Sequence, residues 1–532
     1  MSEIIAESYK LWKARDQIWI SAPTGIGKST FILDELAEHC ADSGIGRVLL
    51  LENRLILKNQ IQVKCLKRCG VYGCDEVDQD VKDFRGITIA TYQEIETRYR
   101  DGTLDMFLRS RNIFYCVFDE AHYILEDSTF RRQTGYWGEI IKLMKSKICI
   151  FMSATIWDFW DFMQWHDKDL QWCTPPTDGY DVFPVEDDAA RWYRGEPKKI
   201  WFYNIHSESR NICPWVYSRF DEVVEKINED ASQDKWIIFT SNKEKAKNEL
   251  LPALHCSKIF LSSDERTEDC LEGLLTENTF AAKVLVATKV LDNGVDIKDC
   301  NLHNIVFDVA SKTELLQMMG RKRWVGADDY VNIFLPRKSQ EFFATLLQKK
   351  INPAISMFYK KFSWEDVLSD PNLYKFVSTF CVVDENQIKL NSAAKAKLFE
   401  EQKLAKRLVE EFQDNDLAFF EMQLGWLDLP KTYNPQHDLT YLRQTGMQKN
   451  LEKFLEENAQ QEMDKEQQMK FREELQNLLD MSGVVLGKNT QPPGKSSINR
   501  YLKGLGWEIV AVGGKRKGEK TVWILKRNRP CM

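Results

Sequence analysis

The sequence lacks any apolar run long enough to cross a lipid bilayer. Its longest apolar runs, at 112–118 and 148–152, are far shorter than the roughly 20 residues that a membrane-spanning helix needs. The first 17 residues mix both signs of charge and lack the apolar core of a secretion signal. These absences argue against membrane insertion and secretion, and we expect a cytoplasmic protein without a membrane partner.

The cysteine content gives no sign of a disulfide framework. Thirteen cysteines, an odd number, are scattered over 532 residues, which is typical of reduced thiols. Cys65, Cys69 and Cys74 are spaced as C-x3-C-x4-C without a fourth nearby ligand. We interpret them as structural thiols, with a metal site as the alternative.

A net positive charge is also missing. The formal net charge is −7, which argues against a chain that coats nucleic acid by bulk attraction. Residues 488–532 are the exception, because eleven Lys and Arg against two Glu give them +9, so that the other 487 residues sum to −16. A basic end on an acidic body predicts a polyanionic partner for that end.

What the sequence does contain is typical of a folded protein with several domains. Hydrophobic residues make up 43% and charged residues 29%, enough apolar material for several cores. Short apolar, β-branched runs recur with helical stretches between them, in a first series at 17–22, 47–52, 86–91, 114–120 and 147–155. A second series follows at 236–241, 258–263, 283–290, 304–310 and 330–336. Such strands predict two α/β domains with parallel sheets covered on both faces.

Two other stretches differ in composition. Residues 157–193 hold ten aromatics, nine acids and two basic residues, and because acids repel phosphate we interpret this stretch as packing at the domain junction rather than base stacking. Residues 340–480 lack strand runs and are predicted to be helical. Their charged, Gln-rich part at 451–479 is interpreted as a solvated amphipathic helix, with a partner contact as the alternative.

A glycine-rich turn follows the first predicted strand. The segment APTGIGKST occupies residues 22–30 and precedes a predicted helix, so its backbone N–H groups and the helix N-terminus form a phosphate cradle. Gly25 and Gly27 allow close backbone approach, Lys28 would reach the β- and γ-phosphates, and the Ser29 hydroxyl would ligate Mg²⁺. The predicted ATP-binding residues are Pro23, Thr24, Gly25, Ile26, Gly27, Lys28, Ser29 and Thr30.

Two adjacent carboxylates end the fourth predicted strand, in FDEAH at 118–122. Asp119 would hold Mg²⁺, and Glu120 would orient and deprotonate the attacking water. A pair of solvated acids is the alternative for such a strand end, but the preceding phosphate loop favours nucleotide hydrolysis.

Together, APTGIGKST and DEAH resemble the ATPase motifs of superfamily 2 helicases, nucleic-acid-dependent ATPases with two RecA-like domains. Further segments are similar to the family's motifs in the family's order, namely ENRLILKNQ (52–60), ATYQ (90–93), SAT (153–155), FTSNKEKA (239–246), VLVATKVLDNGVDI (284–297) and QMMGRKR (317–323). The resemblance covers about residues 15–340 and implies roles for matched positions. Nucleic-acid contacts are implied for Arg54, with Leu57 and Gln60 at the motif spacing, and for Thr91, Thr240 and Thr288.

The resemblance implies three further sets of residues. His122, Ser153 and Thr155 would couple hydrolysis to strand movement, and Gly294 and Asp296 would face the nucleotide. Gln317, Gly320 and Arg321 match the sixth motif, and Arg321 and Arg323 would reach across the cleft to the γ-phosphate. The usual sixth motif ends Q-x-x-G-R-x-x-R, whereas here Trp324 takes the last position and the second arginine is at 323. That string is similar to those of viral origin-binding and mobile-element or phage helicases, and it leaves open which arginine touches the phosphate.

The basic C-terminal segment is predicted to form a helix followed by a hairpin. Ile498, Tyr501, Leu502 and Leu505 give one apolar helical face that Ser496 or Ser497 would cap. Runs 507–512 and 521–525 would pair across a basic loop at 513–520. The pattern resembles a winged helix, with Arg500 and Lys503 on its helix and Lys515, Arg516 and Lys517 on its wing as predicted phosphate contacts.

The sequence therefore predicts an α/β protein with two tandem RecA-like domains, a helical region and a small α+β winged-helix-like module. The predicted boundaries are 1–165, 166–200 for the junction, 201–345, 346–485 and 486–532. The predicted activity is an ATP- and Mg²⁺-dependent helicase or translocase, on DNA rather than RNA, with a replication or mobile-element protein as a possible partner. The alternatives are an ATP-gated replication initiator or loader that separates no strands, and an RNA helicase.

Overall fold

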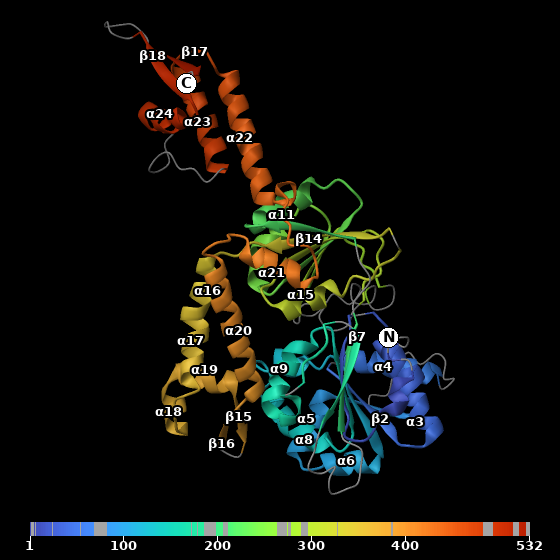
Figure 1. The fold of residues 1–532 in the computed structure, drawn as a ribbon. Helices are drawn as coiled ribbons and strands as arrows, with labels where there is room; N and C mark the ends of the chain where they lie inside the picture. The colour runs from blue at the N-terminus through green and yellow to red at the C-terminus, as the bar shows by residue number, and fades with distance from the viewer. Residues whose placement is uncertain are drawn as a thin grey trace. The chain divides into compact units, whose positions relative to one another are not determined.

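The computed structural model describes all of the chain except residues 2–4, 6, 24, 54, 69–81, 172, 178, 186–197, 206–210, 263–273, 275–277, 289–295, 327, 385–386, 482–492, 514–520 and 528–532. The chain forms two compact units. One comprises Met1–Pro214 with Ile227–Lys431, and the other comprises Trp215–Lys226 with Thr432–Met532. Both units are drawn in Figure 1.

An eight-stranded sheet forms the first domain of the larger unit. Its strands, in spatial order, are β3 (Asp83–Phe84), β4 (Ile87–Thr91), β2 (Arg47–Glu52), β5 (Ile113–Phe118), β6 (Ile148–Ser153), β1 (Gln17–Ser21), β8 (Lys198–Asn204) and β7 (Gly179–Val185). The central strands pair in parallel, and β3 and β7 pair antiparallel at the two edges. The five strands that the sequence predicted here are confirmed, whereas β3, β7 and β8 were not predicted.

Both faces of this sheet are buried, as the continuous apolar strands predicted. Trp19 of β1 belongs to one hydrophobic cluster, and its neighbours Ile18 and Ile20 belong to the cluster on the opposite face, because successive strand side chains alternate. The covering helices are η1 (Ser8–Leu11), α2 (Lys28–Thr30), the π-helical η2 (Phe31–Leu36), α3 (Ala37–Ser43), α4 (Leu55–Arg68), α5 (Tyr92–Arg100), α6 (Leu104–Ser110), α7 (Tyr123–Glu126), η3 (Arg132–Tyr136), α8 (Trp137–Met144), α9 (Ile156–His166) and η4 (Lys168–Leu170).

Only part of the aromatic stretch at 157–193 packs against the first domain. Trp160 packs edge-on against Trp19 and Phe202, with ring centroids 4.8 Å apart in each pair, in line with the packing interpretation. Trp165, by contrast, is 86% exposed. Trp201 of β8 donates its indole N–H to Asp16, 3.0 Å away. The stretch therefore leads into β7 and β8, which extend the first sheet.

The second domain has a six-stranded sheet with the order β11, β12, β10, β13, β14, β9. Its strands are β9 (Asn211–Tyr217), β10 (Lys235–Thr240), β11 (Lys258–Leu261), β12 (Val284–Ala287), β13 (Leu302–Asp308) and β14 (Tyr330–Pro336). The registers from β11 to β14 are all parallel, which confirms the five strands predicted there. Its helices include α11 (Phe220–Glu229), α12 (Lys243–Lys245), η5 (Ala246–Leu250), α13 (Leu251–Ala253) and α15 (Lys312–Met319).

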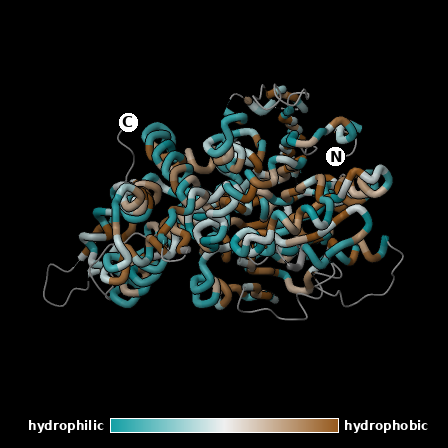
Figure 2. Tube along the Cα trace, turned by 90° about the horizontal axis from the view of Figure 1, so that it is seen from below, coloured by the Kyte–Doolittle hydropathy of each residue, from teal (hydrophilic) through white to brown (hydrophobic). Residues whose placement is uncertain are grey.

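A mostly helical region follows the second sheet. It contains α16 (Gln340–Leu346), the π-helical η7 (Leu347–Ile351), α17 (Asn352–Met357), α18 (Trp364–Ser369), α19 (Pro371–Phe380), α20 (Ser392–Glu411) and α21 (Ala418–Trp426). Figure 2 shows hydrophilic and hydrophobic residues alternating along the helical turns of the chain, as expected for amphipathic helices. The prediction of a region without strands is wrong in one respect, because a short antiparallel hairpin of β15 (Cys381–Asp384) and β16 (Gln387–Leu390) interrupts the helices.

The smaller unit contains a three-stranded antiparallel sheet packed on helices. Its strands β17 (Glu462–Met463), β19 (Val522–Arg527) and β18 (Trp507–Val512) lie in that order, beside η8 (Pro435–His437), α22 (Leu439–Glu457), α23 (Lys465–Met481) and α24 (Lys495–Gly504). The predicted helix and hairpin are present. Asn499 holds them together, because its amide exchanges two hydrogen bonds with the Ile509 backbone of β18, at 2.9 and 2.7 Å.

Among the described residues, none of the helices is both long enough and apolar enough to cross a membrane.

Taken together, the elements form two parallel-sheet RecA-like domains, a helical region and a small antiparallel sheet. The domain boundaries given above stay a prediction.

Gly86 provides a test of the first domain's packing. It turns the β3–β4 hairpin with φ +69°, and an added Cβ would collide with the Ala37 carbonyl of α3. Gly102 has nearly the same φ, +67°, but open space around it. We expect Gly102→Ala to lower the free energy of unfolding by about 1 kcal/mol and Gly86→Ala by about 3 kcal/mol, because only the second adds overpacking to left-handed strain. Urea unfolding of both variants measures this, and equal losses would contradict the packing described here.

Candidate nucleotide site

The glycine-rich turn leaves β1 at the carboxyl edge of the first sheet. Gly25 and Gly27 adopt left-handed backbone angles, φ +85° and +91°, which side chains disfavour. A helical run begins at Lys28 and continues through η2 into α3. Around Lys28, Pro23, Ile26 and Ser29 are half-buried and Thr30 is exposed. Thr24 lies outside the described residues.

The two carboxylates predicted at the fourth strand lie directly opposite this turn. Lys28 Nζ is 2.8 Å from Glu120 Oε1, and the lysine is only 8% exposed. The backbone N–H of Glu120 donates to the Asp119 carboxylate at 3.1 Å. Glu120 itself has φ +50°, a strained angle for a residue with a side chain, of the kind that clusters at functional sites. The structure thus brings together Lys28, Asp119 and Glu120.

The two carboxyl groups differ in their pKa values. Burial raises the pKa of Asp119 to about 6, with Glu120 adding to the rise and Lys28 opposing it. Burial would raise the pKa of Glu120 as well, but the positive Lys28 beside it, together with His122, holds that pKa at about 2. Glu120 is therefore ionised at neutral pH, as a general base must be.

Sequence reasoning passed over a third carboxyl group at this edge. Glu52 ends β2, next to β5, and is 3% exposed. Burial and then the charges of Asp119 and Glu120 raise its pKa well above the ordinary value. The sequence shows only that Glu52 ends a strand, because its position beside β5 depends on strand pairing. Its neighbour Arg54, which was predicted instead, lies outside the described residues.

His122 connects the DEAH segment to two other predicted motifs. Its Nδ1 is 2.6 Å from the Ser153 hydroxyl, and that hydroxyl also accepts from the Thr155 backbone N–H at 2.9 Å. Its Nε2 contacts the side-chain amide of Gln317, at the start of the sixth motif. All three predicted coupling residues therefore meet at one place, and Gln317 adds a contact from the second domain.

The arginines of the sixth motif lie against the phosphate loop. A Cβ added to Gly25 would collide with the Arg323 guanidinium, whose central carbon would be 3.1 Å away. Arg323 also pairs with Asp296 at 2.6 Å. Arg321 is 8% exposed and lies close enough to Glu120 and Lys28 to influence their pKa values.

An extended backbone explains why both arginines face the first domain. The Ile297 N–H donates to the Arg321 carbonyl and the Arg323 N–H donates to the Ile297 carbonyl, both at 2.8 Å. Residues two apart in an extended segment share a face. The intervening Lys322 points the other way, where it is buried and binds both carboxylate oxygens of Asp329 at 3.0 and 2.9 Å. Trp324 lies over the Lys322 ammonium, 5.3 Å from ring centroid to nitrogen, and so packs against this lysine.

The threonines predicted to contact nucleic acid are largely buried. Thr91, Thr240 and Thr288 follow or end strands β4, β10 and β12, so they lie at carboxyl edges of the sheets, but each is at most 5% exposed. The Thr91 hydroxyl accepts from the Glu94 N–H as the cap of α5. Their contacts with a strand stay a prediction, and Gly294 lies outside the described residues.

The C-terminal predictions fall partly on described residues. Arg500 and Lys503 are exposed on α24, whose Ile498 and Leu502 are fully buried. The predicted cap is wrong, because Gly494 precedes the helix and Ser496 and Ser497 lie inside its first turn, without a side-chain cap. Lys515, Arg516 and Lys517 lie outside the described residues.

The donor set at the loop fits a magnesium nucleotide. Ser29 offers a hydroxyl beside the glycine turn and Asp119 a carboxylate, which are the hard oxygen ligands that Mg²⁺ prefers. The described part of the chain, this edge of the sheet included, has no group of three or more His, Cys, Asp or Glu side chains that could hold a metal by themselves. Cys65 is buried in the core of the first domain, and Cys69 and Cys74 lie outside the described residues.

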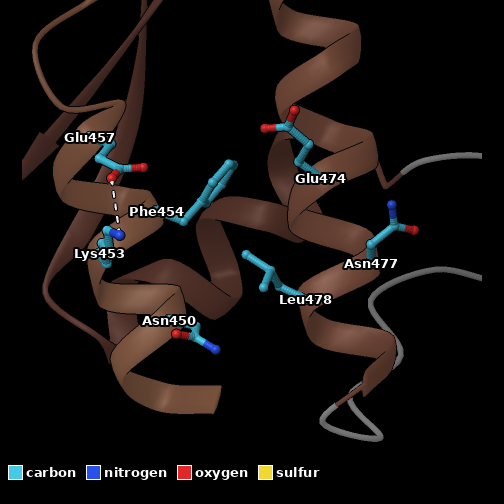
Figure 3. A pocket seen from close by; sticks show the side chains of 7 residues that line it. All are labelled: Asn450, Lys453, Phe454, Glu457, Glu474, Asn477 and Leu478. Carbon is cyan, nitrogen blue, oxygen red and sulfur yellow. Dashed lines mark ion pairs between the residues drawn. The ribbon is translucent and has the colours of Figure 1, made fainter. Parts of the chain in front are cut away.

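An open pocket of about 330 Å³ lies between α22 and α23 in the smaller unit (Figure 3). Phe454 and Leu478 form its apolar floor, and Lys453 and Glu457 pair at its edge with 3.8 Å between nitrogen and oxygen. The pocket includes none of the predicted site residues.

Two family models match the chain. Residues 1–158 match the type III restriction enzyme res subunit, and residues 218–324 match the helicase conserved C-terminal domain. In this order, on two parallel-sheet domains, the two matches identify an ATP-dependent helicase or translocase of superfamily 2. Neither match specifies the nucleic acid.

Solved structures show a distant likeness. Saccharomyces cerevisiae Dbp5 bound to RNA and ADP BeF3 is 16% identical, with a TM-score of 0.38, over 68% of this chain and 89% of that chain. The Escherichia coli DExH-box NTPase HrpB is 14% identical, with a TM-score of 0.39, over 98% of this chain and 62% of that chain. At these TM-scores the likeness carries no argument about activity. None of the curated proteins compared with the chain matches it.

Glu120→Gln tests the carboxylate assigned to water activation. The amide keeps the size of the side chain but cannot accept a proton, so ATP binding should persist while turnover falls by a factor of about 10² or more. Binding of a fluorescent ATP analogue and steady-state phosphate release measure the two quantities. Asp105→Asn, an equivalent change at an exposed position of α6, serves as the control, and near-normal turnover in Glu120→Gln would remove the assigned role.

Proposed function

We propose that the protein is an ATP-driven helicase or translocase that acts on DNA. ATP binds between the two parallel-sheet domains, with its phosphates on the Gly25–Lys28 turn. Glu120 accepts the proton of the attacking water, and Arg321 and Arg323 stabilise the charge that develops on the γ-phosphate. A bound Mg²⁺, held by Ser29 and Asp119, would neutralise phosphate charge.

One observation carries this proposal. The Arg323 guanidinium from the second domain occupies the space next to Gly25 of the first domain's phosphate loop, and Arg321 lies close enough to the Lys28–Glu120 pair to influence both pKa values. Groups from both domains thus converge where the terminal phosphate would lie. Both arginines are assigned to the phosphate, because the extended backbone places them on one face.

Coupling to movement follows from the two-domain site. A nucleotide that contacts Lys28 on one domain and the arginines on the other binds the closed cleft better than the open one. Hydrolysis removes that difference and lets the domains part. His122, two residues after Glu120, contacts Ser153 of the first domain and Gln317 of the second. A change at the catalytic carboxylates would therefore reach the contact between the domains. A strand held across both domains would be moved by a small step in each cycle.

DNA is favoured over RNA by the basic C-terminal module. It carries Arg500 and Lys503 exposed on α24, and its sequence has Lys515, Arg516 and Lys517 between the segments that form β18 and β19. A helix and hairpin with exposed cations match the winged-helix arrangement, and clustered cations favour the phosphates of duplex DNA.

The proposal is tested by two assays on the same preparation. We expect single-stranded or duplex DNA to stimulate ATP hydrolysis more than RNA does, and forked DNA to be unwound in the presence of ATP. Lys28→Ala should abolish both, because it removes the cation that holds the phosphates. DNA-stimulated hydrolysis without strand separation would instead indicate an initiator or loader, and stronger stimulation by RNA would indicate an RNA helicase.

The salt dependence of binding tests the C-terminal module. Each phosphate contact contributes about 0.9 to the slope of log affinity against log salt for duplex DNA. Replacing Arg500 and Lys503 with Gln should therefore lower that slope by about 1.8. The matched control replaces Lys453 and Lys470, exposed on α22 and α23, and should leave the slope unchanged. Titration by fluorescence anisotropy at several salt concentrations measures the slopes, and equal slopes in both double variants would refute this contact surface.

A further inference from the structure

Helix α20 of the helical region spans from the first domain to the second. It has 20 residues, a length of about 30 Å. Its first turn is buried in the first domain, since Ala393 is fully buried within that domain's hydrophobic cluster. Its last turns lie beside α16, which begins a few residues after β14 of the second domain (Figure 1).

Asn391 is the attachment at the first domain. Its side chain is fully buried, and its Oδ1 accepts the N–H groups of Ala393 and Ala394 at 3.0 and 3.2 Å, which caps α20. Its Nδ2 donates to the Ser128 carbonyl at 3.2 Å and the Thr134 hydroxyl at 3.1 Å. One buried amide thus joins the start of α20 to the segment that follows α7, and an unsatisfied group there would be costly.

Lys397 makes a second attachment one turn later. Its Nζ donates to the backbone carbonyl of Glu126 at 2.9 Å and to the Glu126 carboxylate at 2.7 Å. Glu126 ends α7, the helix that begins immediately after His122. A cation at a helix C-terminus stabilises that helix. Lys397 therefore attaches α20 to α7, the short helix that directly follows the DEAH segment.

The opposite end of α20 is fixed by packing. The ring of Phe412, the residue that follows α20, lies 6.0 Å from that of Phe343 in α16, and the ring of Phe419 in the next helix, α21, lies 5.1 Å from it, between centroids. The Gln340 amide donates to the Val409 carbonyl at 2.9 Å. This end is therefore attached to α16, which follows β14 of the second sheet, whereas the other end is attached to the segment that follows DEAH.

We propose that α20 is a brace that sets the separation of the two motor domains, with Asn391 and Lys397 as positioning residues. The inference rests on the proposed function, because it concerns the same cleft. A stiff helix fixed at both ends resists opening, so it raises the fraction of molecules in which the arginines face the phosphate loop. The apparent ATP affinity falls in proportion to that fraction when the brace is released.

The test compares four substitutions in the full chain. Lys397→Met and Asn391→Ala release the brace, Lys397→Arg keeps the charge, and Lys406→Met changes an exposed lysine of the same helix as the control. We expect Lys397→Met and Asn391→Ala to raise the KM for ATP about fivefold or more with kcat little changed, and Lys397→Arg and Lys406→Met to match the wild type. A lower kcat at unchanged KM, together with a lower melting temperature, would indicate a merely structural role and overturn the proposal.

A distance measurement keeps this test separate from the proposed function. Spin labels placed through unnatural amino acids at Arg109 in the first domain and Glu249 in the second, both exposed, report the separation without any ATP turnover. We expect a narrow distance distribution in the wild type and a broader, longer one in Lys397→Met. Identical distributions would overturn the brace. A wild type without ATPase activity but with the expected distributions would overturn the proposed function alone.

Discussion

The buried group of charges at the carboxyl ends of β1 and β5 is the constraint on which the site depends. A charge removed from water is costly unless a partner of opposite sign stands beside it. Lys28 and Glu120 meet this requirement at 2.8 Å, and Arg321 adds positive charge nearby. Phosphate oxygens are the natural competitor for these cations, so the features that stabilise the site also prepare it for a nucleotide.

The second domain meets this group through a short extended segment. The pairing of Ile297 with residues 321–323 forces Arg321 and Arg323 onto one face and Lys322 onto the other. Asp329 and Trp324 then hold the lysine on the far side. The two arginines are two positions apart in the sequence, and in an extended segment this spacing places both on one face. The usual spacing of three positions would place them on one face of a helix instead.

Strong local patterns made much of this fold predictable. All ten apolar runs contain a strand, because strands buried on both faces need continuous apolar sequence, and the glycine turn and the DE pair that the sequence singled out lie opposite each other in the structure. β7 escaped prediction because a half-exposed antiparallel edge strand that contains Pro184 lacks that pattern. The roles of Asn391 and Lys397 depend on contacts with residues more than 250 positions away, and no local pattern reports such pairings. Glu52 shows the same limit, since only the pairing of β2 with β5 reveals its surroundings.

The most direct measurement of the central claim is a structure of the protein with Mg²⁺ and a nucleotide that mimics the transition state of phosphoryl transfer. The account predicts that the group standing for the γ-phosphate contacts Lys28 from one domain and at least one of Arg321 and Arg323 from the other, with Glu120 facing the attacking water. A nucleotide bound away from the Gly25–Lys28 turn, or held there with both arginines turned away from it, would contradict the account.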